Sequence, residues 1–298
     1  MKHEYQLSCE STVDLPFSYI DARGISVLFY TYMVDEQEYL DDMGRDKQAR
    51  EQFYQFIKDG KQPKTSQINM QRYLDYFEPL LRNGDVLHIN FGSGMTPSVH
   101  NARAAAEILQ EKYPERKLVI VDSLCSCLGY GLLVDEVADR WDNGMGLEEL
   151  ASWTQENCLC INHQFFSTDM TCFKRSGRVS GAAATVATIL NIFPLMHLDE
   201  QGRIQAYAKV RGRKAVIDAT VREVEQHIQN GTEYDGKFFL GHSNSPELAA
   251  QVVEALEQKF PALQGKIRIY EIGTIIASHC GPGTVALFFW GEARKTKK

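Results

Sequence analysis

The sequence lacks any long hydrophobic run. Its longest apolar stretches are short, such as residues 285–290, whereas a membrane-spanning helix needs about 20 consecutive apolar residues. The N-terminus reads Met-Lys-His-Glu-Tyr-Gln, and no apolar h-region follows it, so no secretory signal is visible. We therefore expect a cytoplasmic protein with no transmembrane segment.

Basic residues are also in deficit. The chain has 32 Lys and Arg against 39 Asp and Glu, which gives a net charge of −7. A general nucleic-acid binder needs a basic stripe to displace the counterions of the phosphate backbone. The charge balance therefore excludes nucleic acid as a general partner.

The seven cysteines form no Cys-x-x-Cys motif. Cys125/Cys127 and Cys158/Cys160 are Cys-x-Cys pairs, unlike the spacing of zinc ribbons. A metal site that includes His163 is one interpretation, because alternate residues of a strand point to one face. We favour reduced, buried thiols in a cytosolic protein, and we expect no metal and no cofactor.

The common catalytic signatures are missing as well. The sequence contains no Gly-x-x-x-x-Gly-Lys-Ser/Thr, no Gly-x-Gly-x-x-Gly after a strand, no Gly-x-Ser-x-Gly and no His-Glu-x-x-His. Their absence removes the simplest nucleotide-binding, hydrolase and metalloprotease interpretations.

What is present is typical of a folded α/β protein. Apolar residues make up 44% and charged residues 24% of 298 residues, which suits about two domains of roughly 150 residues. In the first half, strand-like residues 85–90 and 117–121 flank a helical pattern at 98–113, and this βαβ rhythm predicts a parallel sheet. In the second half, a turn signal at 199–202 predicts antiparallel pairing.

We therefore predict two α/β domains: a Rossmann-like parallel domain at 1–160 and a domain with a mixed or antiparallel sheet at 161–298. Further helices are predicted at 46–58, 69–81, 129–141, 180–190, 214–229 and 246–259, and further strands at 5–8, 27–33, 163–171, 194–198, 203–210, 237–241, 266–271 and 284–290, with a loop before the last strand.

Five polar or glycine-rich segments are candidates for chemistry. They are residues 10–16, 64–67, 92–98, 174–178 and 279–283. Each one alone can be a helix cap, a tight turn or a solvated face. Most lie next to a strand, and in open α/β sheets ligands bind at the carboxyl ends of strands. Together, their hydroxyls, helix N-terminal amides and His279 predict a site for a carboxylate or phosphate.

In this order, the segments resemble the DegV family of fatty-acid-binding proteins over nearly the whole chain. Its motifs are similar to Glu10-Ser11-Thr12-Val13-Asp14-Leu15, Thr65-Ser66-Gln67, the loop from Ser93 to Ser98, Asp122-Ser123, the basic loop from Lys174 to Arg178, and Ile272-Gly273-Thr274 through Gly283. The last of these is the most specific. Three positions depart from the family pattern: Glu10, Pro97 and Ser176 stand where the family has Asp, Gly and Gly. Pro97 removes a backbone N–H from the loop.

The resemblance implies one long-chain fatty acid, such as palmitate, stearate or oleate, buried between the two domains. It implies that Thr65 and Ser93 bind the carboxylate and that His279 lies near it. We expect a supporting shell around the head group from Ser11, Thr12, Gly94, Thr96, Asp122 and Gly281. Apolar residues near these loops are candidates for the tail tunnel: Phe165, Ile189, Phe193, Ile275 and Ile276.

The resemblance also implies a partner. In the family, a separate ATP-dependent fatty acid kinase subunit phosphorylates the bound carboxylate to an acyl phosphate. The basic loop with Arg175 and Arg178 would contact that subunit. The chain itself would then be a lipid-binding subunit, not an enzyme, which agrees with its lack of a nucleotide motif.

Three alternatives stay open from the sequence. A stand-alone hydrolase would use Ser93 as nucleophile, His279 as base and Asp122 or Asp14 to orient the base. A small-anion-binding module would use the same segments without a lipid tunnel. A structural or regulatory protein would use them only as caps and turns.

Overall fold

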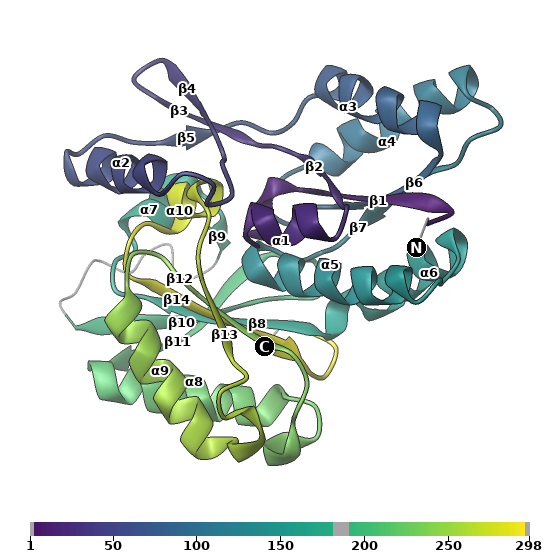
Figure 1. Cartoon of the computed structure of the whole chain (residues 1–298). Helices are drawn as coiled ribbons and strands as arrows, with labels where there is room; N and C mark the ends of the chain where they lie inside the picture. The colour runs from purple at the N-terminus through teal and green to yellow at the C-terminus, as the bar shows by residue number, and fades with distance from the viewer. Residues whose placement is uncertain (1–2, 181–190, 296–298) are drawn as a thin grey trace.

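The computed structural model describes residues 3–180 and 191–295. In this part of the chain, two large sheets are stacked with a buried helix between them, and a small third sheet projects to one side (Figure 1). The arrangement confirms the predicted two-part α/β architecture, with a parallel sheet first and a mixed sheet second.

The first sheet has four strands, in the order β2-β1-β6-β7, and all its pairings are parallel. The strands are β1 (Tyr5–Glu10), β2 (Ser26–Leu28), β6 (Asp85–Asn90) and β7 (Leu118–Asp122). Helices α3 (Met70–Asn83) and α4 (Ser98–Lys112) cover one face, and α5 (Cys127–Asp142) and α6 (Leu147–Asn157) cover the other (Figure 1). The short α1 (Phe17–Ala22) joins β1 to β2.

The second sheet has seven strands, in the order β13-β12-β14-β8-β10-β11-β9. They are β8 (Ile161–Ser167), β9 (Val179–Ser180), β10 (Ile192–Leu198), β11 (Ile204–Arg211), β12 (Phe238–His242), β13 (Arg268–Glu271) and β14 (Thr284–Trp290). The central pairings are antiparallel, and the two edge strands pair parallel to their neighbours. Helices α8 (Arg213–His227) and α9 (Pro246–Lys259) cover the outer face. All strands of the first sheet lie before residue 161, and all strands of the second sheet lie after residue 160. The domain boundary between residues 160 and 161 stays a prediction.

The third sheet contains β3 (Thr31–Val34), β4 (Gln37–Leu40) and β5 (Lys64–Thr65), with α2 (Lys47–Lys58) between the last two. The predicted strand at 27–33 is split, because the chain leaves the parallel sheet after Leu28 and begins an antiparallel hairpin at Thr31. Asp35 and Glu36 make the hairpin turn with positive φ angles of 49° and 69°.

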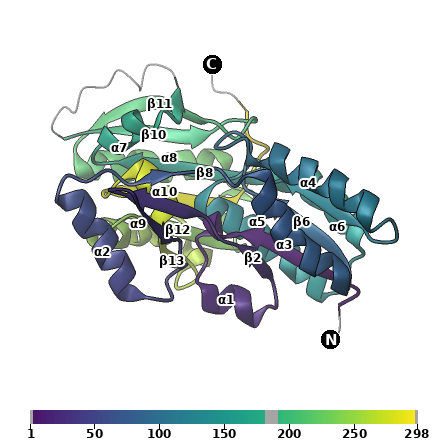
Figure 2. The same cartoon turned by 90° about the horizontal axis from the view of Figure 1, so that it is seen from above.

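Two short helices replace predicted irregular or extended segments. Helix α10 (Thr274–Cys280) occupies the predicted loop before the last strand, and it lies against β3 and β5 (Figures 1 and 2). Helix α7 (Thr171–Ser176) follows β8, so the strand predicted at 163–171 ends at Ser167. The helix predicted at 180–190 lies outside the described residues, apart from Ser180, which belongs to β9.

Helix α5 is the layer between the two large sheets. It contacts β1 on one side and β8, β12 and β14 on the other. Twelve of its 16 residues are buried, which explains an apolar pattern that runs all the way round the helix. The resulting core cluster contains residues of both sheets, and a second cluster lies under α8 and α9. Within residues 3–180 and 191–295, no helix is long and apolar enough to cross a membrane.

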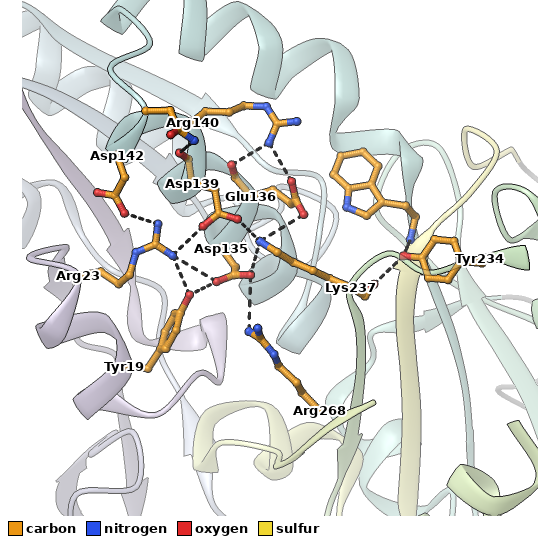
Figure 3. A network of polar contacts seen from close by, with 12 residues as sticks. Tyr19, Arg23, Asp135, Glu136, Asp139, Arg140, Asp142, Tyr234, Lys237 and Arg268 are labelled. Carbon is orange, nitrogen blue, oxygen red and sulfur yellow. Dashed lines mark hydrogen bonds and ion pairs between the residues drawn. The ribbon is translucent and has the colours of Figure 1, made fainter. Parts of the chain in front are cut away.

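An ionic network ties α5 to the segment after α1 and to strands β12 and β13 (Figure 3). The buried Asp135 of α5 lies with Oδ2 2.6 Å from Lys237 Nζ, just before β12. Arg23, which follows α1, places Nη1 3.6 Å from Asp135 Oδ1 and 3.0 Å from Asp139 Oδ1. Arg268 of β13 approaches Asp135 Oδ2 at 3.9 Å. The network therefore fixes the two sheets relative to α5.

Candidate functional site

A cavity of about 220 Å³ lies where the third sheet, α10 and the loop after β6 meet. Its polar lining is Tyr30, Thr65, Ser66, Gln67, Thr96, Ser126, Arg178 and His279. Its apolar lining is Phe91, Met95, Pro97, Phe173, Ile204, Ile275, Ile276 and Cys280. The cavity thus brings together parts of four of the five segments singled out in the sequence.

A second, smaller cavity of about 50 Å³ extends the first one between the two large sheets. The two share five lining residues: Ser126, Phe173, Ile204, Ile276 and Cys280. Beyond these, the smaller cavity is lined mainly by apolar side chains, which include Phe165, Leu198, Ile272, Ala286 and Phe288. The combined space has a polar end and an apolar end.

Thr65 and His279 form the centre of the polar end. Thr65 Oγ1 lies 2.7 Å from His279 Nε2, although 214 residues separate them in sequence. Strand β5 holds the threonine, and the last turn of α10 holds the histidine. Burial, aided by the positive charges of Arg178 and Arg175, lowers the pKa of His279 to about 4. The imidazole is therefore neutral at neutral pH, and among the described residues its buried Nδ1 has no hydrogen-bond partner.

Ser93 is not among the residues that line the cavity, and its predicted place beside Thr65 stays a prediction. The loop turns sharply, with Met95 N–H bonded to Gly92 O at 2.9 Å. This turn leaves Ser93 N–H bonded to Asp122 Oδ1 at 3.0 Å. Thr96, three residues later, is buried and lines the cavity. Thr96 is therefore a second candidate hydroxyl in this loop for the carboxylate.

Most of the predicted supporting shell stabilises loops instead of lining the cavity. Ser11 Oγ accepts a bond from Tyr30 N–H at 3.0 Å and thereby fixes a cavity-lining residue. Thr12 Oγ1 is buried and forms no hydrogen bond within residues 3–180 and 191–295. A Cβ on Gly94 would lie 2.3 Å from Gly202 O, so this glycine lets the loop pack on the β10–β11 turn. Asp122 Oδ1 accepts the backbone N–H of Leu124 as well as that of Ser93. Gly281 follows the last residue of α10 with a left-handed φ of 68°.

The two arginines lie on the protein surface, and their charges act on His279. Arg178 is exposed and lines the cavity, and its Nη1 donates to Ser176 O. Arg175 is also exposed and places Nη2 3.6 Å from Cys172 Sγ. Both guanidinium groups lower the pKa of His279 through their charge. The polar end of the cavity therefore lies in the positive field of two exposed side chains.

The predicted tail residues divide into two groups. Ile275, Ile276 and Phe165 line the cavities. Phe193 does not, because it packs edge-to-face on Phe166 under α8 and α9, on the opposite face of the mixed sheet. We therefore withdraw Phe193 from the tail tunnel. Ile189 lies outside the described residues.

Glu10, one of the departures from the family pattern, supports the cavity wall from behind. Its side chain is fully buried. Oε2 accepts the backbone N–H of Phe91 at 2.8 Å, and Oε1 accepts the Tyr73 hydroxyl. Glutamate thus reaches the first residue after β6, where Phe91 lines the cavity.

Tyr30 and Ser126 are cavity residues that the sequence did not reveal. Tyr30 lies between β2 and β3 and bonds Ser98 Oγ through its hydroxyl at 3.0 Å. Ser126 precedes α5, and its N–H donates to His163 Nε2 at 3.1 Å. Neither residue lies in a motif; only the tertiary fold brings them to the cavity.

The geometry does not assemble the alternative hydrolase. His279 Nε2 is bonded to Thr65, and Asp122 accepts backbone N–H groups. In the described ranges, no hydrogen bond joins Ser93 to His279. The cysteines are all free thiols. No group of three or more His, Cys, Asp or Glu residues in residues 3–180 and 191–295 is placed to hold a metal ion.

Fold and site together define an α/β protein in which two sheets enclose an elongated cavity with one polar end. The family described as "Uncharacterised protein, DegV family COG1307" matches residues 6–292, and the chain belongs to the DegV family. The DegV domain-containing protein CPE0026 of Clostridium perfringens is 32% identical over 293 residues, which cover 98% of this chain and 99% of that protein.

Solved structures share the fold. A DegV family protein from Eubacterium eligens, loaded with heptadecanoic acid, superposes with a TM-score of 0.83 at 17% identity, over 97% of this chain and 100% of that one. The Streptococcus pneumoniae Fatty Acid Kinase (Fak) B3 protein, loaded with linoleic acid, gives 0.80 at 20% identity, over 97% and 99%.

Proposed function

We propose that this protein binds one long-chain fatty acid. The observation that carries the proposal is the Thr65–His279 pair at the polar end of a cavity that continues into an apolar one. The carboxylate lies at Thr65, Thr96 and His279, and the tail passes Ile276 toward Phe165. Structural relatives loaded with heptadecanoic and linoleic acid support this assignment.

The chemistry of the lining suits such a ligand. Hydroxyls and a neutral imidazole can donate to a carboxylate, which offsets the loss of its hydration. The exposed guanidinium groups of Arg175 and Arg178 add an attractive field. A C16 tail buries about 15 carbon groups at about 0.8 kcal/mol each, or about 12 kcal/mol of gross driving force. Association and ordering reduce this figure but leave tight binding.

The finer proposal is that the protein presents the bound carboxylate to a separate ATP-dependent fatty acid kinase subunit, which forms the acyl phosphate. The protein supplies the acceptor and catalyses no reaction itself. Two features support this: the exposed Arg175 and Arg178 act on His279 at the polar end of the cavity, and the fold is shared with the S. pneumoniae Fak B3 protein.

Mass spectrometry tests the binding proposal directly. Protein purified from a bacterial host should carry one adduct in the native spectrum, and organic extraction should release a C14–C18 fatty acid. A clean apo mass, together with no uptake of added oleate or palmitate, would contradict the proposal. The small-anion-binding module would then be the better interpretation.

Head-group variants test the assignment of the hydroxyls. Thr65→Val and Thr96→Val should each weaken oleate binding by roughly 1–3 kcal/mol, the value of a hydrogen bond to a charged group. Displacement of a fluorescent fatty acid measures the effect. Ser93→Ala is the matched control and should leave the affinity unchanged. Weaker binding by Ser93→Ala together with normal binding by Thr96→Val would return the carboxylate to Ser93.

The arginines test the kinase proposal separately. Arg175→Ala should leave oleate affinity within about twofold, because exposed charges contribute little to affinity. The same variant should slow acyl-phosphate formation by a cognate kinase. The exposed Lys209→Ala is the control. If Arg175→Ala lost the lipid, the arginine would belong to the binding site and not to the partner surface.

A further inference from the structure

A separate cavity of about 130 Å³ at the start of α10 contains two buried carboxyl groups. Asp14 is 6% exposed and follows the 3-10 turn Ser11–Val13, and Asp41 is 1% exposed and follows β4. Both oxygens of Asp14 and Oδ2 of Asp41 are buried, and in the described part of the chain none of the three has a hydrogen-bond partner of normal geometry. The fatty-acid site uses neither residue.

Both carboxyl groups lie close to Gly273. A Cβ at this glycine would lie 2.4 Å from Asp14 Oδ1 and 3.7 Å from Asp41 Oδ1. The other titratable or charged groups around the pair are Arg50 and Tyr54 of α2, Asp42, Tyr32 of β3, Cys127 of α5, Cys280 of α10, and Tyr270 and Glu271 of β13. Arg50 is already paired with Glu271.

Two ionised carboxylates in such a space are costly, and holding a proton removes the cost. Burial raises the pKa of Asp14 well above its usual range; the charge of Asp41 adds to the rise, and Cys127, Gly273 and Arg50 oppose it. Burial likewise raises the pKa of Asp41 to about 6, against the hydrogen bonds from Ser11 and Thr274.

Asp41 connects the pair to two walls of the fatty-acid cavity. Thr274 Oγ1, in the first turn of α10, donates to Asp41 Oδ1 at 3.1 Å. The same helix carries Ile275, Ile276 and His279. Asp41 N–H also donates to Tyr30 O at 3.0 Å, and Tyr30 lines the cavity.

We propose that Asp14 and Asp41 share one proton in the folded protein and are positioning residues that hold α10 and Tyr30 in place for the fatty acid. Loss of this proton sets two negative charges against each other at the start of α10 and loosens both walls. The effect on lipid affinity rests on the proposed function, whereas the shared proton does not.

The direction of the pH dependence follows from the raised pKa values. The folded state holds the proton more tightly than the unfolded chain, whose aspartates titrate near a pKa of about 3.9. The stabilisation is therefore complete below that value, and it is lost as the pH rises through about 6 for Asp41 and higher for Asp14. Asp14→Asn removes this loss, and asparagine tolerates the left-handed φ of 55° at this position.

The test compares wild type, Asp14→Asn and the exposed control Asp21→Asn between pH 4.5 and 9. The melting temperature of Asp14→Asn minus that of wild type should be near zero at pH 4.5 and reach at least about 3 °C at pH 8.5. The oleate affinity of wild type should fall about tenfold relative to Asp14→Asn from pH 6 to pH 8.5, which corresponds to one pKa unit. Oleate itself titrates in this pH range, but it does so equally for both proteins. The ratio of the two affinities therefore does not contain that contribution.

A different result would contradict each part of the proposal. A difference in melting temperature that does not change with pH overturns the shared proton. A pH-dependent difference with a constant affinity ratio overturns the positioning role. A wild type that binds no oleate at any pH overturns the proposed function and leaves the melting profile to decide on the proton.

A bound cation is the competing occupant of this cavity. A rise in melting temperature on adding Mg²⁺ or Ca²⁺ that Asp14→Asn abolishes would replace the shared proton by a metal ion. If Asp14→Asn does not fold, Asp41→Asn is the second variant. Its amide oxygen still accepts from Thr274, and it should show the same trend with pH.

Discussion

Ile276→Trp is expected to lower fatty-acid affinity at least about 100-fold while the protein stays folded. Ile276 lines both parts of the cavity, at their junction. An indole there occupies the passage, so the tail stops short of the apolar end. Exclusion of about four methylene groups at about 0.8 kcal/mol each removes about 3 kcal/mol, which is about two decades in the dissociation constant. Displacement of a fluorescent fatty acid measures the loss.

The matched control is Ile269→Trp on β13, because Ile269 is 47% exposed and lines neither cavity. It should bind oleate as wild type does. Ile276 is only partly buried and borders empty space, so the larger side chain fills the cavity instead of straining a packed core. If Ile276→Trp still purified with one fatty acid per chain, the tail would follow a different path.

The regular elements could be predicted because their periodicity is local. The strand at 85–90 was predicted with both ends correct, and the helix at 98–113 was one residue too long. Helix α10 could not be predicted, since its seven residues give too short a pattern for a helical period. It is held by tertiary contacts, such as the bond from Thr274 to Asp41, which is 233 residues away in sequence.

The site was predicted unevenly for similar reasons. Thr65 and His279 came from the family resemblance, and no local pattern could have placed them 2.7 Å apart. The place of Ser93 at the carboxylate stays a prediction, whereas Thr96 of the same loop lines the cavity. Phe193 was misplaced because β10 is buried on both faces, so its hydrophobic run does not reveal which face meets the cavity.

Gly129→Ala is expected to destabilise the protein by about 3 kcal/mol, although alanine is the better helix former by about 1 kcal/mol. Gly129 lies in the first turn of α5, where a Cβ would be 2.1 Å from His163 Nε2. The ring cannot easily retreat, because Nε2 accepts Ser126 N–H at 3.1 Å and Nδ1 lies 3.0 Å from Ile161 O. Phe288 packs edge-to-face on it at 5.3 Å.

Denaturant unfolding measures this cost, and Gly146→Ala is the control. Gly146 has a φ of −65° and open space around its Cβ position, so its substitution should change stability by only a few tenths of a kcal/mol. Replacing His163 by alanine frees the space, so Gly129→Ala with His163→Ala should cost at least about 1 kcal/mol less than the two changes summed. A Gly129→Ala variant as stable as wild type would mean that α5 lies farther from the mixed sheet, and the apolar end of the cavity would then be wider than described.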